Sequence, residues 1–502
     1  MTRVLELDHI TKRFGPLVAN DDVTLHLDQG EILSLLGENG AGKTTLMNIL
    51  FGHYTADSGS VKVNGQVLPP GQPRAAINAG VGMVHQHFTL AGNLTVLDNI
   101  MIGSEKLIRF DSDRAGARRR VQEIAARFGL PVDPSARVAD LSVGERQRVE
   151  ILKALYRQAG ILILDEPTAV LARPEAERLF DTLRGMTASG LSIIFISHKL
   201  HEVMAASDRV VVLRGGKVVA ERRTSDTDQG ELAELMVGRR VARPKREAQL
   251  PGEPVVTARG LGLIDGGQVR LDAMDFTVRA GEILGIVGVS GNGQAALGRV
   301  LSGQVRPTSG SLLLGDADLS RMSPRQMVQA GLGRIPEDRQ AEGAIGELAL
   351  WENAVLERLG DPAFSRAGFV RRKAAQAFAK GLIDRFDIRG AGPDTRTSLL
   401  SGGNMQKLIL GRNLTGKPRF ILANQPTRGL DEGAIAAVHA EMLAARAQGA
   451  AILLITEDLE EALALSDRIQ AIVKGRLSAP VLPEAADPRT LGLMMAGVWD
   501  AV

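Results

Sequence analysis

Gly37-Glu38-Asn39-Gly40-Ala41-Gly42-Lys43-Thr44 is the stretch of sequence that decides the fold. It has the glycine, lysine and threonine spacing of a phosphate-binding loop, and it lies between a short apolar run and a helix-like run, as that loop requires. The glycines let backbone N–H groups turn toward phosphate oxygens, and the start of the helix adds a positive dipole. Lys43 supplies a charge for the phosphates, and Thr44 offers a hydroxyl to Mg²⁺. The alternative is a glycine turn with a purely structural role.

This loop lies in a sequence that occurs twice. EILSLLGENGAGKTTL at 31–46 recurs as EILGIVGVSGNGQAAL at 282–297, an offset of 251 residues. Four further motifs recur in the same order, one at an offset of 251 and three at 259, so the second copy has eight additional residues between 337 and 400. We therefore expect an internal duplication. It predicts a domain at 1–240, a linker at 241–253 and a domain at 254–502; a surface loop within one domain is the alternative for the linker.

The composition excludes several classes of protein. The 502 residues include no cysteine, so disulfides, thiolate metal sites and cysteine nucleophiles are excluded. The net charge is +2 and aromatic residues make up 3%, which argues against an extended nucleic-acid footprint and base-stacking platforms. No run reaches the roughly 18 apolar residues of a membrane helix. The N-terminal sequence lacks the apolar run of a secretion signal.

Within each copy, strand patterns alternate with helix patterns. Alternating residues at 4–10 and 23–27 predict strands, and continuous apolar runs at 32–37 and 161–166 predict buried parallel strands. Residues 105–135 are rich in Arg, Ala and Glu at helical spacing and predict a mostly helical subdomain. Each copy is therefore predicted to be an α/β domain with a helical insert.

Two carboxylates end one of the buried strands of the first copy. Asp165 is placed to hold Mg²⁺, directly or through water, and Glu166 to accept a proton from an attacking water. Without the loop upstream, a helix N-terminus would explain the acidic pair equally well.

Three further residues of the first copy are candidates that depend on context. Gln86, after a short strand, is placed to contact the metal or the nucleophilic water; the alternative is a solvated loop residue. His198, at a strand end, is placed to donate to the γ-phosphate, although a lone histidine is more often structural. Phe14 is placed to stack on adenine, and its alternative is a core phenylalanine.

A further motif narrows the family. Leu400-Ser401-Gly402-Gly403-Asn404-Met405-Gln406 and Leu141-Ser142-Val143-Gly144-Glu145-Arg146-Gln147, in order with the motifs above, resemble the signature of ATP-binding cassette (ABC) ATPases. The resemblance covers essentially the whole chain and implies tandem P-loop cassettes, each with a RecA-like α/β core, an antiparallel β part and a helical subdomain. Two fused cassettes resemble the ATP-binding subunit of bacterial monosaccharide and nucleoside importers. The stretches at 83–90, 334–339 and 424–431 are most similar to the nucleoside and simple-sugar branch.

The resemblance implies a composite ATP site, in which the loop of one cassette faces the signature of the other. The resemblance then assigns catalytic roles to Glu166, His198, Gln86 and Lys43. It assigns the binding of Mg²⁺ to Thr44, Gln86 and Asp165. The remaining contacts to ATP fall on Phe14, Gly37, Glu38, Asn39, Gly40, Ala41, Gly42, Lys43, Thr44 and Thr45 from the first copy, and on Ser401, Gly402, Gly403 and Asp431 from the second.

The reciprocal site lacks these groups. Taken in chain order, the residues at the positions of Phe14, Lys43, Thr44, Gln86, Asp165, Glu166 and His198 are Asp265, Gln294, Ala295, Glu337, Asn424, Gln425 and Glu457. Ala172 stands approximately at the position of Asp431. Since all the losses fall on one site, we expect one hydrolytic and one structural site.

The resemblance also implies partners and a location. It implies two integral-membrane permease subunits, gripping the surface near Gln86 and 87–104, an extracytoplasmic substrate-binding protein, and a peripheral place on the cytoplasmic face of the inner membrane, with no nucleic acid. One alternative is a soluble tandem-cassette ATPase acting on ribosomes or DNA, against which the short linker and the degenerate second site argue. The other is a non-enzymatic nucleotide-gated scaffold, against which Glu166 and His198 argue.

Overall fold

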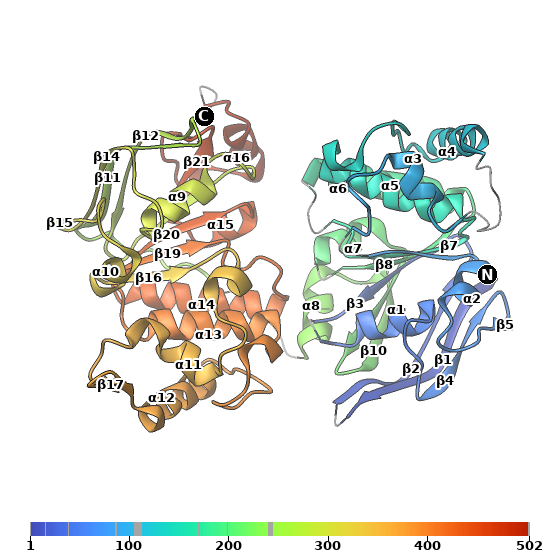
Figure 1. The fold of residues 1–502 in the computed structure, drawn as a ribbon, viewed down its shortest axis with the longest axis horizontal. Coiled ribbons are helices and arrows are strands. Elements are labelled where there is room, and N and C mark those ends of the chain that lie inside the picture. The colour runs from blue at the N-terminus through green and yellow to red at the C-terminus, as the bar shows by residue number, and fades with distance from the viewer. Residues whose placement is uncertain are drawn as a thin grey trace. The chain divides into compact units, whose positions relative to one another are not determined.

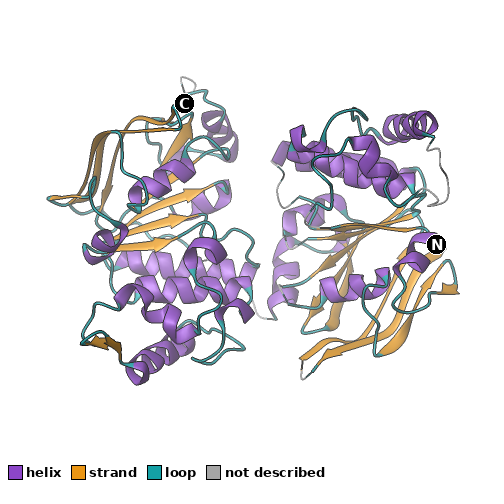
Figure 2. Ribbon diagram, in the orientation of Figure 1, coloured by secondary structure: helices purple, strands orange, loops and turns teal. Residues whose placement is uncertain are grey.

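The chain folds into two compact units, unit 1 (Met1–Val241) and unit 2 (Ala242–Val502). The structure is a computed structural model, and it describes residues 2–15, 17–38, 40–85, 88–104, 113–168, 171, 173–197, 199–238 and 244–499. Each unit combines helices with both short and long strands, as Figures 1 and 2 show. Across the described ranges, no helix has the length and apolar character needed to cross a bilayer.

Unit 1 contains two sheets. An antiparallel sheet has the strand order β2-β1-β4-β5, and a six-stranded sheet has the order β10-β9-β3-β8-β7-β6, in which only β10 runs antiparallel to its neighbour. The strands are β1 (Arg3–Phe14), β2 (Leu17–Asp28), β3 (Ile32–Leu36), β4 (Ser58–Val63), β5 (Gln66–Val67), β6 (Val81–Val84), β7 (Ile161–Asp165), β8 (Ser192–Ile196), β9 (Arg209–Arg214) and β10 (Lys217–Arg223). The α-helices are α1 (Lys43–Phe51), α2 (Pro73–Asn78), α3 (Val96–Met101), α4 (Arg114–Phe128), α5 (Val143–Tyr156), α6 (Arg173–Ala188), α7 (Leu200–Ala206) and α8 (Gln229–Val237).

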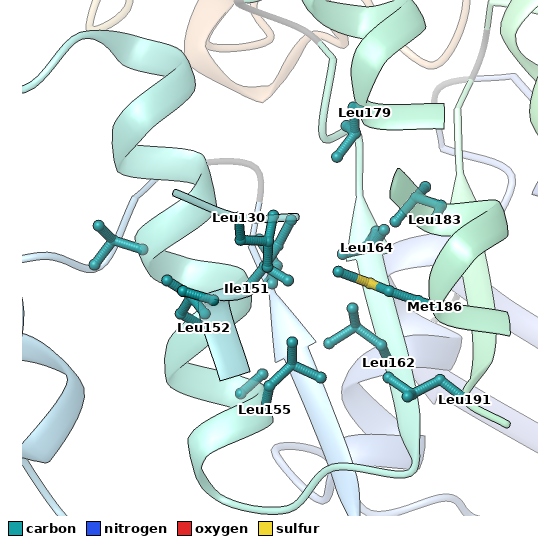
Figure 3. Packing of buried hydrophobic residues seen from close by; sticks show 14 of the residues in the cluster. Leu130, Ile151, Leu152, Leu155, Leu162, Leu164, Leu179, Leu183, Met186 and Leu191 are labelled. Carbon is teal, nitrogen blue, oxygen red and sulfur yellow. The ribbon is translucent and has the colours of Figure 1, made fainter. Parts of the chain in front are cut away.

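The central strands of unit 1 are buried on both faces, as their continuous apolar sequences predict. On β7, Leu162 and Leu164 belong to a core with α3 to α6, whereas Ile161 and Ile163 belong to a core with α1 and the antiparallel sheet. Figure 1 shows α3 to α6 on one side of this sheet and α1 on the other. Figure 3 shows how side chains of α5, β7 and α6 converge in the first of these cores.

Unit 2 has the same plan of two sheets, and a short hairpin is described in it as well. Its antiparallel sheet has the order β12-β11-β14-β15, its six-stranded sheet the order β16-β19-β20-β13-β21-β22, and β17 and β18 form a separate hairpin. The strands are β11 (Pro254–Asp265), β12 (Gln268–Arg279), β13 (Ile283–Val287), β14 (Ser309–Leu314), β15 (Ala317–Asp318), β16 (Leu332–Ile335), β17 (Ser365–Arg366), β18 (Phe369–Val370), β19 (Phe420–Asn424), β20 (Ala451–Thr456), β21 (Arg468–Val473) and β22 (Arg476–Leu477). The α-helices are α9 (Gln294–Leu301), α10 (Pro324–Gln329), α11 (Leu350–Val355), α12 (Arg372–Arg385), α13 (Gly402–Leu414), α14 (Glu432–Ala447), α15 (Leu459–Leu465) and α16 (Pro488–Met495).

The structure divides the eight additional residues of the second copy between two places. Matching bridges join Thr95 to Arg137 in unit 1 and Ala349 to Arg396 in unit 2. The offset between the copies is therefore 254 residues from Thr95 to Ala349 and 259 residues from Arg137 to Arg396. Three residues are inserted before Ala349, near a π-helical turn at Arg339–Gly343, and five after it, around the β17–β18 hairpin.

The sequence predicts a linker at 241–253, and the described part of it packs against unit 2. Arg246 pairs with Asp467 at 3.0 Å and also with Glu484, and its side chain is 17% exposed. Residues 244–253 have neither helix nor strand structure. Charged residues in this segment thus hold it on the second unit.

Candidate nucleotide-binding site

Three loops of unit 1 meet at one edge of the six-stranded sheet. Strands β3, β8 and β7 are neighbours and run parallel, so the loops that follow them lie at the same edge, where such sheets bind ligands. The glycine-rich loop follows β3, and Asp165 and Glu166 follow β7. The sequence-predicted phosphate loop and acidic pair are therefore brought to one place.

Lys43 is the first residue of α1 and points back into its own loop. Its Nζ donates hydrogen bonds to the carbonyl oxygens of Gly37 at 2.6 Å and Glu38 at 3.0 Å, and the residue is 7% exposed. The ammonium group is thus buried at the helix N-terminus, where several backbone N–H groups have no partner within the helix. This arrangement suits an anion, because both the charge and the helix dipole are positive.

Position 42 of the loop requires glycine. Its φ of 101° lies in the left-handed region, and a Cβ there would come within 2.2 Å of the Ala19 carbonyl oxygen. The side chain of Asn20 donates to the Gly42 carbonyl at 3.2 Å and is fully buried. The sequence analysis did not identify Asn20 as part of the site, since nothing in its local pattern marks a residue that supports a loop 22 positions away.

Asp165 and Glu166 form a strained acidic pair. Asp165 is 8% exposed, and burial, together with the adjacent Glu166 carboxylate, raises its pKa to about 6, with Lys43 acting in the opposite direction. Glu166 has a φ of 47°, which is uncommon for a residue with a side chain, and its N–H donates to the Ile196 carbonyl at 2.9 Å. Strain of this kind is typical of functional sites. A bound cation would relieve the charge repulsion.

Glu202 is a second residue that sequence reasoning missed. Its buried carboxylate accepts hydrogen bonds from Thr168 at 2.5 Å and Ser197 at 2.8 Å, which joins the loop after β7 to the loop after β8. The threonine contact recurs in unit 2, where Glu461 accepts from Thr427 at 2.7 Å, but the second partner there is His439 of α14, at 3.1 Å. The shared offset of 259 residues was the signal that could have identified this brace.

The other residues predicted in unit 1 fall into two groups. Phe14 is 43% exposed at the end of β1 and contacts Tyr54 edge to face, so it is not the core phenylalanine that was the alternative. Thr44 is exposed and Thr45 half-buried at the start of α1. Asn39, Gln86, Ala172 and His198 lie outside the described residues.

In unit 2 the signature segment opens α13. Ser401 is the N-cap, and its Oγ accepts hydrogen bonds from the backbone N–H and the side-chain Nδ2 of Asn404, at 3.4 and 3.1 Å. Gly402 and Gly403 form the first turn, and Asp431 caps α14 by accepting from Ala434 N–H at 2.9 Å. Among the residues that the structure describes, no acceptor takes the Ser401 hydroxyl proton.

The signature of unit 1 differs at this hydroxyl. Ser142 caps α5, but its hydroxyl donates to the carboxylate of Glu145 at 2.7 Å. The same contact lowers the pKa of Glu145, so the carboxylate stays ionised. A negative charge therefore lies at the start of this helix, which does not suit a phosphate.

The second glycine-rich loop keeps the backbone of the first but not its side chains. Gln294 begins α9 where Lys43 begins α1, and its Nε2 donates to the Val289 carbonyl at 2.9 Å. Its buried Oε1 and the Oδ1 of Asn424 have no hydrogen-bond partner among the described residues. Glu337 is paired with Arg428. This loop presents no cation to a phosphate.

Together, the fold and the loop geometry define a P-loop nucleotide-binding protein with two copies of one domain. The model of the ABC transporter family matches residues 20–169 and 271–428. The chain therefore belongs to the ABC transporter family and is an ABC transporter ATPase, as the sequence resemblance predicts. The predicted fold of two α/β cassettes is confirmed as well.

Full-length relatives support this assignment. The glucose import ATP-binding protein TsgD13 of Haloferax volcanii is 44% identical over all of this chain and 97% of its own length. The nucleoside import ATP-binding protein NupA of Lactococcus lactis is 42% identical over 98% of each. A solved archaeal ribosome recycling factor, aABCE1, covers 98% of this chain and 92% of its own with a TM-score of 0.64 at 18% identity, which shows the tandem fold alone.

Proposed function

We propose that this ATPase is the energy-coupling subunit of an importer for simple sugars or nucleosides, with one hydrolytic site. The observation that carries the proposal is the asymmetry between the two loops. Unit 1 presents Lys43, Asp165 and Glu166 at one sheet edge, whereas unit 2 presents Gln294, Asn424 and Gln425 at the corresponding positions.

ATP would be bound by the loop of unit 1 and the signature of unit 2 together. Backbone N–H groups at the start of α1 and the Lys43 ammonium would hold the β- and γ-phosphates. The Ser401 hydroxyl, with Gly402 and Gly403 at the start of α13, would complete the cage around the γ-phosphate. Asp431 would brace this site, and Phe14 would stack on the adenine. The free proton of Ser401 supports this choice of signature over that of Ser142.

The residues of unit 1 fit Mg²⁺. A hydroxyl and a carboxylate are the oxygen ligands that Mg²⁺ prefers, and Thr44 and Asp165 supply them beside the phosphate loop. Burial and the neighbouring Glu166 carboxylate raise the pKa of Asp165 to about 6, and a cation bound beside it would favour its ionised form. Gln86 would be the third contact. When bound, the ion neutralises phosphate charge during hydrolysis.

The protein would promote hydrolysis by positioning the water and the phosphates and by stabilising charge, without a covalent intermediate. Glu166 would orient the attacking water and accept its proton, and its strained backbone fixes the carboxylate at the end of β7. His198 would donate to the γ-phosphate. Lys43 would exchange its bonds to the loop carbonyls for bonds to phosphate oxygens.

The import role rests on the relatives, which are named for glucose, nucleoside, guanosine and ribose import. By this reading, two integral-membrane permease subunits bind near Gln86 and 87–104 and receive cargo from an extracytoplasmic binding protein. The chain is then peripheral to the cytoplasmic face of the membrane. Closure on ATP and opening after hydrolysis would drive the cycle, with the segment after Gln86 relaying closure to the permease.

The test is a pair of matched substitutions in the purified chain. Glu166→Gln should lower the steady-state ATPase rate by at least about 100-fold, because general-base assistance is typically worth that much. Gln425→Glu, at the corresponding position of unit 2, should change the rate by less than about twofold, since the neighbouring groups stay absent. Full activity in Glu166→Gln would show that the site is wrongly assigned.

A further inference from the structure

Unit 1 has a cleft of about 340 Å³ at the opposite end of β3 from the nucleotide loop. Ile32, at the start of β3, lines it, whereas the nucleotide loop follows the end of that strand. The remaining lining comes from the ends of α6 and α7, from Ser207 and Asp208 between α7 and β9, and from the short 3-10 turn Thr224–Asp226. The cleft therefore lies outside the catalytic site.

Within the described part of the chain, this cleft is lined by a carboxylate without a cation and by a hydroxyl without a hydrogen bond. The carboxylate of Asp208 is exposed, accepts the Ile32 N–H at 2.8 Å, and has no ion-pair partner among the described residues. The buried Oγ1 of Thr224 has no hydrogen-bond partner among them either. Arg184 also lines the cleft, and its guanidinium donates to Asp181 and to the Ala205 carbonyl. Buried polar groups are usually paired, so the unpartnered Thr224 hydroxyl indicates an occupant of this cleft.

The same place in unit 2 is filled. Asp467 corresponds to Asp208 at the offset of 259 and accepts the Ile283 N–H at the same distance of 2.8 Å. There, however, the guanidinium of Arg446 donates to both carboxylate oxygens, at 2.8 and 2.7 Å, and Arg246 adds a contact at 3.0 Å. The Asp467 side chain is only 10% exposed as a result.

The filling element is the chain's own linker. Arg446 also donates to the Glu247 carbonyl at 3.1 Å and to the Gln249 side chain at 3.4 Å, and Arg246 pairs with Glu484. A non-helical peptide segment thus occupies the unit 2 cleft and presents an arginine to the aspartate. At the offset of 259, unit 1 has Thr187 in place of Arg446 and Ser225 in place of Glu484.

We infer that the open cleft of unit 1 binds an extended, arginine-bearing segment of the membrane partner. Asp208 accepts the arginine, and the orphaned Thr224 hydroxyl bonds to the segment. The cytoplasmic segments of membrane proteins carry an excess of lysine and arginine, which matches this carboxylate. The choice of partner rests on the proposed import function, whereas the chemistry of the occupant rests on the linker in unit 2.

The first test uses the linker peptide as a probe on the full chain. Since the chain has no cysteine, Ser225→Cys gives a single thiol at the cleft for a fluorescent label. A peptide with the sequence of residues 244–250 should bind saturably, and its Arg246→Ala form at least tenfold more weakly. Asp208→Asn in the chain should weaken the first peptide by the same factor and leave the ATPase rate unchanged. Absence of saturable binding, or equal binding of both peptides, would overturn the inference.

The second test identifies the segment in the assembled importer. A photo-reactive residue at position 225 should cross-link to an arginine-bearing cytoplasmic segment of the membrane subunit, and Asp208→Arg should abolish the cross-link. Cross-linking to a second copy of this chain or to a soluble protein would refute the choice of partner. The two proposals fail in distinguishable ways. The peptide-binding test uses the chain alone, without permease, so it reports only on the cleft. The ATPase test with Glu166→Gln reports only on the hydrolytic site.

Discussion

The two glycine-rich loops share a backbone but not a chemistry. Gly42 and Gly293 have φ values of 101° and 119°, and Glu166 and Gln425 both adopt the left-handed region, at 47° and 49°. The N–H of Glu166 donates to the Ile196 carbonyl at 2.9 Å, and the N–H of Gln425 donates to the Ile455 carbonyl at 2.8 Å.

The difference lies in the side chains that would meet a nucleotide. The glycines and the packing of the sheet hold the loop in either case, whereas the charged groups to which we assign catalysis occur only in the loops of unit 1. Unit 2 therefore retains the loop backbone without the charged side chains, and under the proposed function it would contribute to hydrolysis through its signature segment.

Exchange of the two equivalent loop residues should give the largest effect. Lys43→Gln should lower the ATPase rate by about 1,000-fold and weaken ATP binding by roughly 10- to 100-fold, since a charge-assisted hydrogen bond contributes about 1.5–3 kcal/mol. Steady-state kinetics and nucleotide titration measure the two quantities. Gln294→Lys is the matched control and should not create a second active site, because Asn424 and Gln425 remain. A gain of activity in that variant would contradict the asymmetry.

The aspartates at the starts of β3 and β13 give the next comparison. Asp467→Asn leaves Arg446, which is 3% exposed, without its carboxylate, and should destabilise unit 2 by about 3 kcal/mol. Asp208→Asn removes an exposed carboxylate without an ion pair and should change the stability of unit 1 by less than about 0.5 kcal/mol. Calorimetric unfolding of the full chain measures both. Equal losses would show that the two clefts do not differ in this way.

A smaller effect is expected from the acidic pair and should depend on pH. The folded chain raises the pKa of Asp165 to about 6 from its ordinary value of 3.8, so ionised Asp165 destabilises the nucleotide-free state as pH rises between these values. Asp165→Asn should therefore stabilise nucleotide-free unit 1 by about 2 kcal/mol at pH 8 and by about half of that at pH 5. Thermal unfolding at the two pH values tests this. A gain that increases toward low pH would contradict it.

The residues that the sequence predicts well are those whose chemistry leaves few choices. Gly42 tolerates no Cβ, Lys43 begins a helix directly after the glycine-rich loop, and Asp165 ends a buried strand, so each is recognisable from its neighbours. The α/β class and the duplication follow from patterns of the same kind.

What the sequence does not reveal depends on partners distant along the chain. Arg246 has the pattern of a solvated linker, yet it pairs with an aspartate 221 residues away. Asn20 and Glu202 are polar residues whose roles arise only when loops from different strands meet. The division of the inserted residues into three and five likewise requires the bridges that fix the register.

The most direct test of one site built from both units exchanges the two signature serines. Ser401→Ala removes a hydroxyl whose proton is available, and Ser142→Ala removes one that donates to Glu145. We predict that Ser401→Ala lowers the ATPase rate of the full chain by about 10- to 100-fold, as the loss of one transition-state hydrogen bond implies, while Ser142→Ala changes it by less than about twofold. Equal effects, or a larger effect of Ser142→Ala, would contradict the account.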